Sequence, residues 1–442
     1  MIELTTEQVA ALAPDEKAAV AGRKLGSGKT WRHQGTSDQA LWGECQGSAV
    51  YQTKIDLSDL AYNCTCPSRK LPCKHVLGLL FWAATSPSDF PNAQPPDWVT
   101  TWLEKREATS KRREEKKAAR DKPVDAEAQA KRFAKRHRAV LDGLERLDLW
   151  LKDTVRGGIA GLETKPPSYW ESQAKRLVDA QAKGLAGRVR RMGEIPGTGV
   201  DWPQRLLAAM GRLALLTHAY RRLDELEEKL QADIRQLVGW TVSQDELDRV
   251  GESIGDRWAV VSHTEEEEER LRVRRNWLVG RSSGRHALVI QFAVASQPFG
   301  QALLAGTWFD GVVVFYPGAE PQRAMLKERR GELSRFDSAL PGHASVDGFL
   351  LAVAESLARQ PWLGRHLAIL RNVVIVPRDE EPWLVVDECR SGLPLARGEH
   401  WQLLAGSGGH PVELIAEWDT AQLWPLGYMA DGTFRSLGTT QR

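Results

Sequence analysis

The feature that most constrains this chain is a group of four residues with metal-binding side chains. Cys64, Cys66, Cys73 and His75 fall within twelve positions and form a CxC-x6-CxH pattern. Three thiolate sulfurs and one imidazole nitrogen are a donor set typical of tetrahedral Zn²⁺, with Zn–S distances of about 2.3 Å. Because the chain supplies all four ligands, the pattern predicts one structural zinc ion with no open position for a catalytic water.

The distribution of cysteines supports this interpretation. The chain has five cysteines, and two of them, Cys45 and Cys389, lie away from the group. Clustered cysteines in a reducing compartment indicate metal ligands rather than disulfides. The alternative is that the clustered cysteines are free thiols packed as small apolar side chains. This alternative gives no role to a CxC motif next to a CxH motif. We expect Cys45 to be a packing residue rather than a fifth ligand.

The charge of the whole chain points to no polyanionic partner, because 60 basic and 58 acidic side chains leave a net charge of +2. Locally, a zinc ion with three thiolates and a neutral histidine carries a single negative charge, and Arg69, Lys70 and Lys74 lie in the ligand loop to offset it. No apolar run reaches about 18 residues and no signal-peptide pattern opens the chain, so we expect a cytoplasmic protein.

Regular patterns surround the metal-binding group. Alternation of apolar and polar residues predicts strands, and a continuous apolar run that ends at Ser-Pro predicts a short buried helix. The predicted elements are a β-hairpin over 40–48 and 50–57, a third strand over 61–64, a helix over 76–84, and one or two short helices within 1–30. We therefore expect an N-terminal region over 1–86 whose zinc-stapled core lies at about 40–84.

The CxC-x6-CxH order followed by an apolar helix resembles the SWIM zinc finger, which occurs in Swi/Snf-type helicases, Mutator-type transposases and a set of bacterial proteins. Three stretches are similar to stand-alone bacterial SWIM proteins: Leu-Trp-Gly-Glu-Cys-Gln-Gly-Ser at 41–48, Tyr-Gln-Thr-Lys-Ile-Asp-Leu at 51–57, and Cys-Pro-Ser-Arg-Lys-Leu-Pro-Cys-Lys-His at 66–75. The similarity covers about residues 25–85, and no helicase or transposase motif accompanies it. Those enzymatic activities are therefore not implied.

The resemblance implies that Cys64, Cys66, Cys73 and His75 hold the zinc ion and that the finger binds DNA or another protein. It also implies a class of partner. Stand-alone bacterial SWIM proteins are often encoded beside MoxR-type AAA ATPases and von Willebrand A-domain proteins.

A Pro-containing, charged linker is expected over 87–138. Within it, residues 104–138 carry 14 basic and 7 acidic side chains, and Pro123 should break any helix. The interleaved charges favour a solvated helix or a mobile arm, while the alternative is a basic surface that follows nucleic-acid phosphates.

Two further domains are expected after the linker. Apolar residues at helical spacing predict a bundle over 139–250 with three antiparallel helices, and in the third the spacing runs from 213 to 237 and is interrupted only at Glu227. Coiled-coil dimerisation through that third helix is the alternative. Strand-like runs and one helix at 346–359 predict a mainly antiparallel α+β domain over 256–442. The run Glu265–Glu269 is expected to be a solvated acidic loop.

The sequence therefore predicts a multidomain α+β protein with a zinc-stapled finger, a helical bundle and a C-terminal α+β domain. No enzyme is expected, since His286, His366 and His410 lack the sequence partners of a catalytic triad. The predicted function is zinc binding in a protein-interaction adaptor, and the alternative is sequence-tolerant DNA or RNA binding. The nucleic-acid contacts in that alternative are Arg69, Lys70, Lys74, Lys111, Arg112 and Arg113.

Overall fold

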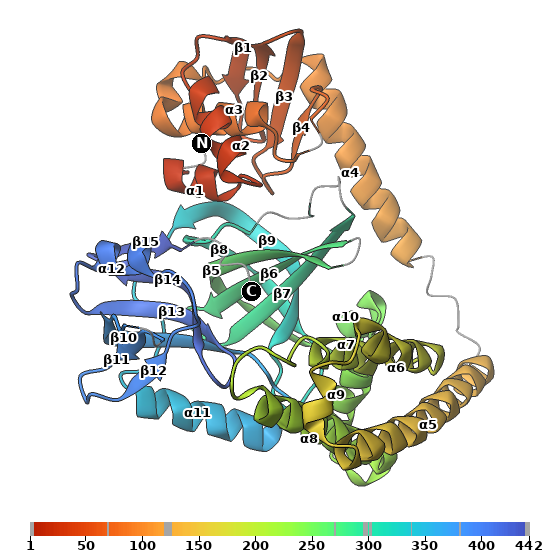
Figure 1. Ribbon diagram of the computed structural model, residues 1–442. Helices are drawn as coiled ribbons and strands as arrows, with labels where there is room; N and C mark the ends of the chain where they lie inside the picture. Colours follow the sequence, from red (N-terminus) through yellow and green to blue (C-terminus); the bar gives the residue numbers. More distant parts are fainter. Residues whose placement is uncertain are drawn as a thin grey trace.

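The computed structural model describes residues 4–437 except 69, 119–125, 269–270, 295–298, 300–302, 337 and 380–381. The fold is mixed α+β, which confirms the predicted class. A closed barrel lies at the centre, and the N-terminal region, a helical bundle and a second large sheet surround it (Figure 1).

The N-terminal region is a four-stranded antiparallel sheet with helices against it. Its elements are α1 (Thr6–Ala11), α2 (Glu16–Leu25), β1 (Trp31–Thr36), β2 (Ala40–Gln46), β3 (Val50–Asp56), β4 (Tyr62–Cys64), α3 (Lys74–Thr85) and the 3-10 turn η1 (Pro87–Asp89). The sheet order is β1-β2-β3-β4. The predicted hairpin, third strand and helices are confirmed. Strand β1 was not predicted, because Trp-Arg-His-Gln-Gly-Thr shows no apolar alternation.

Helix α3 is buried because it is apolar on nearly every side, from Val76 to Trp82. It lies so close to α2 that the two backbones require glycine at the crossing. A Cβ on Gly22 would come within 2.6 Å of the Leu77 Cβ, and one on Gly78 would come within 2.7 Å of the Leu25 Cβ. This close packing fixes α3, and with it the last two metal-binding residues, against the rest of the region.

The other face of the sheet is covered by the start of α4 (Asp97–Ala118). Val99 is fully buried against Ala40 and Trp42. The Lys54 side chain is only 8% exposed, and its Nζ donates a hydrogen bond to the Trp98 carbonyl at 2.9 Å. The stretch predicted as a linker therefore contributes packing to the N-terminal region, while Pro123 lies outside the described residues.

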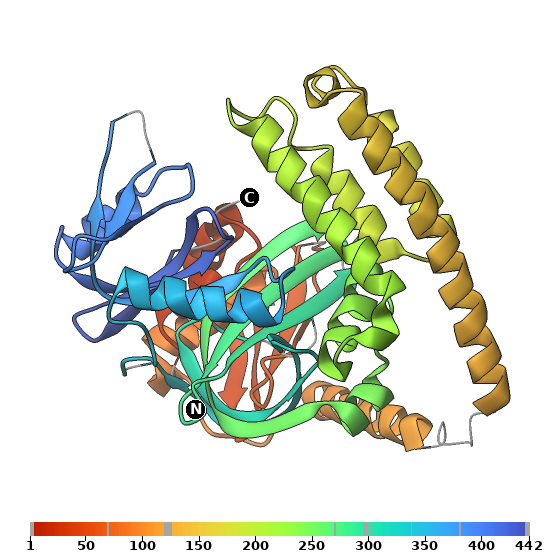
Figure 2. The ribbon, with the colours of Figure 1, turned by 90° about the horizontal axis from the view of Figure 1, so that it is seen from below.

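The helical bundle follows α4. Its elements are α5 (Ala126–Arg156), η2 (Ile159–Leu162), α6 (Pro167–Asp179), α7 (Lys183–Met192), α8 (Trp202–Arg221), η3 (Leu223–Glu225), α9 (Glu228–Val238) and α10 (Gln244–Val250). Figure 2 shows the long helices side by side along one flank of the barrel.

Two bundle predictions are wrong. The described helices are more than three, and the helix predicted from 213 to 237 is interrupted between α8 and α9. The chain turns there because Leu223 is buried. The Leu226 carbonyl accepts a hydrogen bond from the Gln231 side chain at 2.9 Å, which is not a backbone bond of a helix. After the turn, Ile234 and Val238 join the bundle core. The apolar face of α8 is buried within the same chain, which leaves it unavailable for the alternative coiled coil.

The barrel is built from β5 (Glu252–Glu268), β6 (Leu271–Gly280), β7 (His286–Val294), β8 (Thr307–Phe315) and β9 (Arg323–Arg335). It closes in the order β5-β6-β7-β9-β8, with a parallel β7–β9 pair and antiparallel pairing elsewhere.

The prediction of a solvated acidic loop is wrong for the first part of the Glu265–Glu269 run, and Glu269 lies outside the described residues. Glu265 and Glu266 belong to strand β5. Glu265 accepts hydrogen bonds from Arg272 at 2.6 Å and from Arg274 at 3.1 Å, so these acidic side chains pair across the β5–β6 hairpin.

The second large sheet has the order β12-β11-β10-β13-β14-β15. Its elements are α11 (Val346–Arg359), β10 (His366–Val376), β11 (Leu384–Val386), β12 (Gly392–Pro394), α12 (Trp401–Ser407), β13 (Val412–Trp418), β14 (Leu423–Ala430) and β15 (Thr433–Ser436). All its strand pairs are antiparallel, as predicted. Trp277 and Trp308 of the barrel share a core with Ile369 and Ile415 of this sheet.

The N-terminal region and the barrel also share one core. Leu77 and Phe81 of α3 belong to the same cluster of buried side chains as Trp258 and Phe315 of the barrel. Helix α1 lies at this junction, where the Gln8 side chain donates to the Gly306 carbonyl at 3.3 Å. Among the described helices, none combines the length and the apolar content needed to cross a lipid bilayer.

Candidate metal centre

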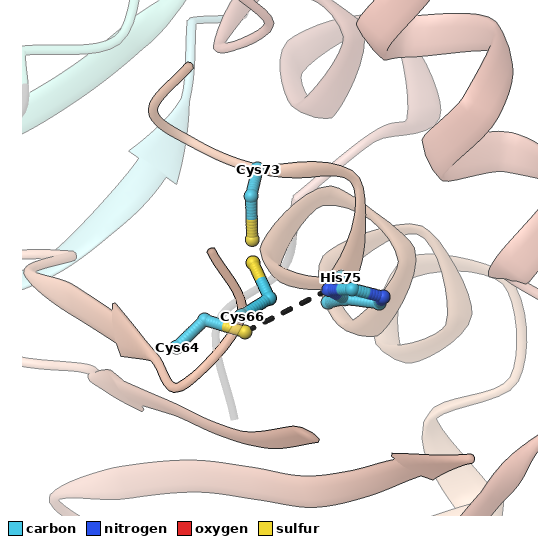
Figure 3. Close-up of side chains that lie close together, drawn as sticks. All are labelled: Cys64, Cys66, Cys73 and His75. Carbon is cyan, nitrogen blue, oxygen red and sulfur yellow. Dashed lines mark hydrogen bonds between the residues drawn. The ribbon is translucent and has the colours of Figure 1, made fainter. Parts of the chain in front are cut away.

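The four predicted ligands are positioned by the end of one strand and the start of one helix. Cys64 is the last residue of β4, and Cys66 lies in the turn that follows it. Cys73 is the N-cap residue of α3, and His75 lies in the first turn of that helix. The intervening loop leaves the sheet and returns to the helix, so both ligand pairs face the same space (Figure 3).

The geometry of the group fits a single zinc ion. One donor atom from each of the four residues can be chosen so that all lie within 4.8 Å of one another. Donors of a tetrahedral site with bonds of about 2.3 Å lie roughly 3.8 Å apart, which is compatible with this grouping. In Figure 3 the sulfurs of Cys66 and Cys73 face each other, and the Cys64 Sγ lies 3.7 Å from the His75 Nδ1.

Neighbouring side chains hold two of the ligands in place. The Thr53 hydroxyl donates a hydrogen bond to the Cys64 Sγ at 3.3 Å, and Thr53 is fully buried on β3. The Tyr51 ring stacks on the His75 ring with centroids 4.8 Å apart and an interplanar angle of 28°. Sequence reasoning missed both supports. The strand alternation holds the signal, because 51 and 53 share a face of β3 and Thr53 pairs with Cys64.

Contacts among the three cysteine side chains shift the pKa values of their thiols. A hydrogen bond from Cys73, with others from His75 and Thr53, lowers the pKa of the Cys64 thiol to about 4. The same contact with Cys64 raises the pKa of Cys73, and burial raises the pKa of Cys66. These contacts favour the thiolate form at Cys64, and a divalent cation would favour the thiolate form of all three cysteines.

Cys45 lies outside the group, as expected. It is 1% exposed, belongs to the buried core, and its Sγ lies 3.8 Å from the Thr30 Oγ1.

The predicted nucleic-acid contacts are spread over separate elements. Lys70 forms an ion pair with Asp15, and Lys74 is exposed at the start of α3. Lys111 lies on α4, which covers the opposite face of the sheet, and pairs with Glu107 at 2.6 Å. Arg69 and the side chains of Arg112 and Arg113 lie outside the described part of the structure. Among the described candidates, Lys111 therefore lies apart from Lys70 and Lys74.

Two protein-family models match the chain. The SWIM zinc finger matches residues 51–81, which contain all four ligands. This chain contains a SWIM zinc finger. A second match, the SWIM-associated four-helix bundle domain, covers residues 135–238, so the chain also carries a bundle that is associated with this finger. That match replaces the three-helix bundle predicted from the sequence.

The SWIM finger explains the donor set. Its family assignment and the grouping of three cysteines with one histidine support one structural zinc ion. The two matched ranges end before β5 begins. A search of curated proteins and a search of solved structures found no match to the chain.

Proposed function

We propose that this SWIM protein is a non-enzymatic adaptor that binds another protein through a surface shaped by zinc. The observation that carries the proposal is the place of the metal centre, which closes the loop between β4 and α3. Cys73 and His75 are buried, whereas Cys64 and Cys66 stay partly exposed. An ion bound there fixes the form of an exposed loop, and the four protein ligands leave it no position for substrate.

The continuity of the buried core supports the same proposal. Because α3 shares a core with the barrel, the zinc loop is displayed from a large and rigid body. Rigid display lowers the conformational cost of binding a partner. The proposed adaptor works in the cytoplasm, where its clustered thiols stay reduced.

The first partner to test is a MoxR-type AAA ATPase or a von Willebrand A-domain protein, the class that the family resemblance implies. Zinc-loaded full-length protein is mixed with the purified candidate and analysed by size-exclusion chromatography with light scattering. We expect a complex with the wild type and with Cys389→Ser, whose cysteine is exposed and far from the centre in sequence. Cys66→Ser should abolish the complex, and equal binding by that variant would contradict the proposal.

Nucleic-acid binding is a second candidate, supported by the anchoring of α4 on the finger. Lys54 and Trp98 fix the start of this helix, so a basic stretch extends from the zinc-stapled region. Pairs such as Lys111 with Glu107 at 2.6 Å on α4 reduce its charge and weigh against this candidate.

The test of the second candidate is fluorescence anisotropy with labelled single- and double-stranded DNA and RNA between about 50 and 200 mM salt. Binding that falls steeply with salt and disappears after charge reversal over 111–138 would favour it over the adaptor.

A further inference from the structure

A groove of about 470 Å³ lies beside the metal centre, within the size range of ligand-binding sites. Its walls come from three places: the start of α2, the turn between β2 and β3, and the metal-binding loop. Cys66, Cys73 and His75 form part of the wall, so the zinc ion helps to define the shape of the groove.

The rim of the groove carries two lysines that are free to bind an anion. Lys17 on α2 and Lys74 on α3 are exposed, and neither forms an ion pair among the described residues. The third lysine, Lys70, is already paired with Asp15. The hydrogen bond from Lys70 lowers the pKa of Asp15, so this carboxylate stays ionised inside the groove.

Polar groups other than lysine also line the groove. The hydroxyls of Ser48 and Tyr51 are hydrogen-bonded to each other at 2.7 Å. Asp15 accepts from the Ala18 backbone N–H at 2.7 Å, and its side chain remains 35% exposed. The groove thus presents two free cations on its rim together with oxygen acceptors.

This mixture of charges fits a polypeptide better than a nucleic acid. A sugar-phosphate backbone prefers an uninterrupted basic track and has no N–H group to donate to the Asp15 carboxylate. An extended peptide can place carboxylates on Lys17 and Lys74 while its backbone N–H groups donate to Asp15 and Ser48. Among the described wall residues, the Tyr51 ring already stacks on the His75 ring, which leaves little surface for stacked bases.

We infer that the groove binds an acidic segment of a partner protein, with Lys17 and Lys74 each holding one carboxylate. The inference rests on the adaptor function proposed above and assigns that function a site. Binding requires zinc, because three of the ligands form the wall of the groove.

The test is fluorescence polarisation of the zinc-loaded full chain with a labelled octapeptide of alternating Glu and Ala. The neutral probe is the same peptide with Gln in place of Glu. We expect the Glu peptide to bind and the Gln peptide not to bind. The double variant Lys17→Glu, Lys74→Glu should weaken binding of the Glu peptide by about tenfold or more.

A matched control is the double variant Lys24→Glu, Lys29→Glu, which makes the same change in charge at exposed positions outside the groove. It should keep the wild-type affinity, and both variants should keep one zinc per chain by metal analysis. Equal weakening by the two variants would overturn the groove as the site. If an oligothymidylate probe binds more tightly than the Glu peptide and displaces it, the ligand of the groove is a nucleic acid and the inference is overturned.

The outcome separates the groove from the adaptor function. If the Lys17→Glu, Lys74→Glu protein still forms the complex with its ATPase or von Willebrand A-domain partner, the groove is the wrong site and the adaptor proposal stands. If the wild type forms no such complex but binds the Glu peptide in the groove, the partner class is wrong and the groove stands.

Discussion

The Thr53 hydroxyl donates a hydrogen bond to the sulfur of Cys64 across the β3–β4 pair. Hydrogen bonds to a metal-binding sulfur orient the ligand and stabilise its charge. Thr53→Val keeps the shape of the side chain and removes the donor. We expect zinc affinity to fall by about tenfold, measured by competition with a chromophoric chelator, with an unchanged fold by circular dichroism. An unchanged affinity would show that the contact does not support the zinc ion.

Cys66→Ser removes one of the four ligands. We expect zinc affinity to fall by more than about 100-fold, because losing a ligand lowers the affinity more than losing a hydrogen-bond donor to a ligand does. Hydrogen exchange should rise first in β4 and the loop before α3, while the bundle keeps its protection. Cys389→Ser is the control and should keep one zinc per chain. Full zinc content in Cys66→Ser would refute the assigned ligand set.

Val99→Ala tests whether α4 belongs to the N-terminal region. Val99 is fully buried against Ala40 and Trp42, so losing two methyl groups should cost roughly 2 kcal/mol. Hydrogen exchange in the first turns of α4 should rise while the zinc content stays constant. Thr101→Ala, at an exposed position of the same helix, should leave the exchange unchanged. The assignment fails if both variants behave alike.

Asp233 should make the free energy of unfolding depend on pH. This residue lies where the bundle contacts a loop of the barrel. Its carboxylate on α9 accepts from the Ala319 N–H at 2.7 Å, and burial raises its pKa to about 6. The folded protein therefore holds this proton more tightly than the unfolded chain. The stabilising contribution is complete below about pH 4 and is lost as the pH rises through about 6.

Asp233→Asn stays uncharged and should raise the melting temperature by a few degrees at pH 7.5, with a smaller gain at pH 5.5. Both melts are recorded by calorimetry with zinc in excess. Asp224→Asn, an exposed change nearby, should give no pH-dependent difference. A gain for Asp233→Asn that is the same at both pH values would exclude the proposed cause.

The metal-binding residues were predictable because their information is local. All four lie between the last residue of β4 and the first turn of α3, so their spacing alone places them together. The positions of Tyr51 and Thr53 needed the strand register as well. The role of Lys54 was not predictable, because a lysine in an alternating strand gives no sign that Trp98 will cover it.

The closed barrel could not be predicted for the opposite reason. Closure depends on β9, which pairs with β8, the strand before it, and with β7 across a longer sequence separation. Arg323–Arg335 contains many charged residues and shows no clean apolar alternation, so the pattern that reveals a strand is missing. Similarly, the apolar spacing predicted one helix through Leu223. In the structure, burial of that residue turns the chain and separates α8 from α9.

The core that joins the finger to the barrel limits how this finger can be reused. Leu77 and Phe81 of α3 and Val9 of α1 are buried in a cluster that continues into the barrel. A graft of residues 51–81 onto another scaffold would leave this apolar surface in water, even with its zinc ion bound. A graft that keeps the finger folded therefore has to include α1, α2 and a complementary barrel surface.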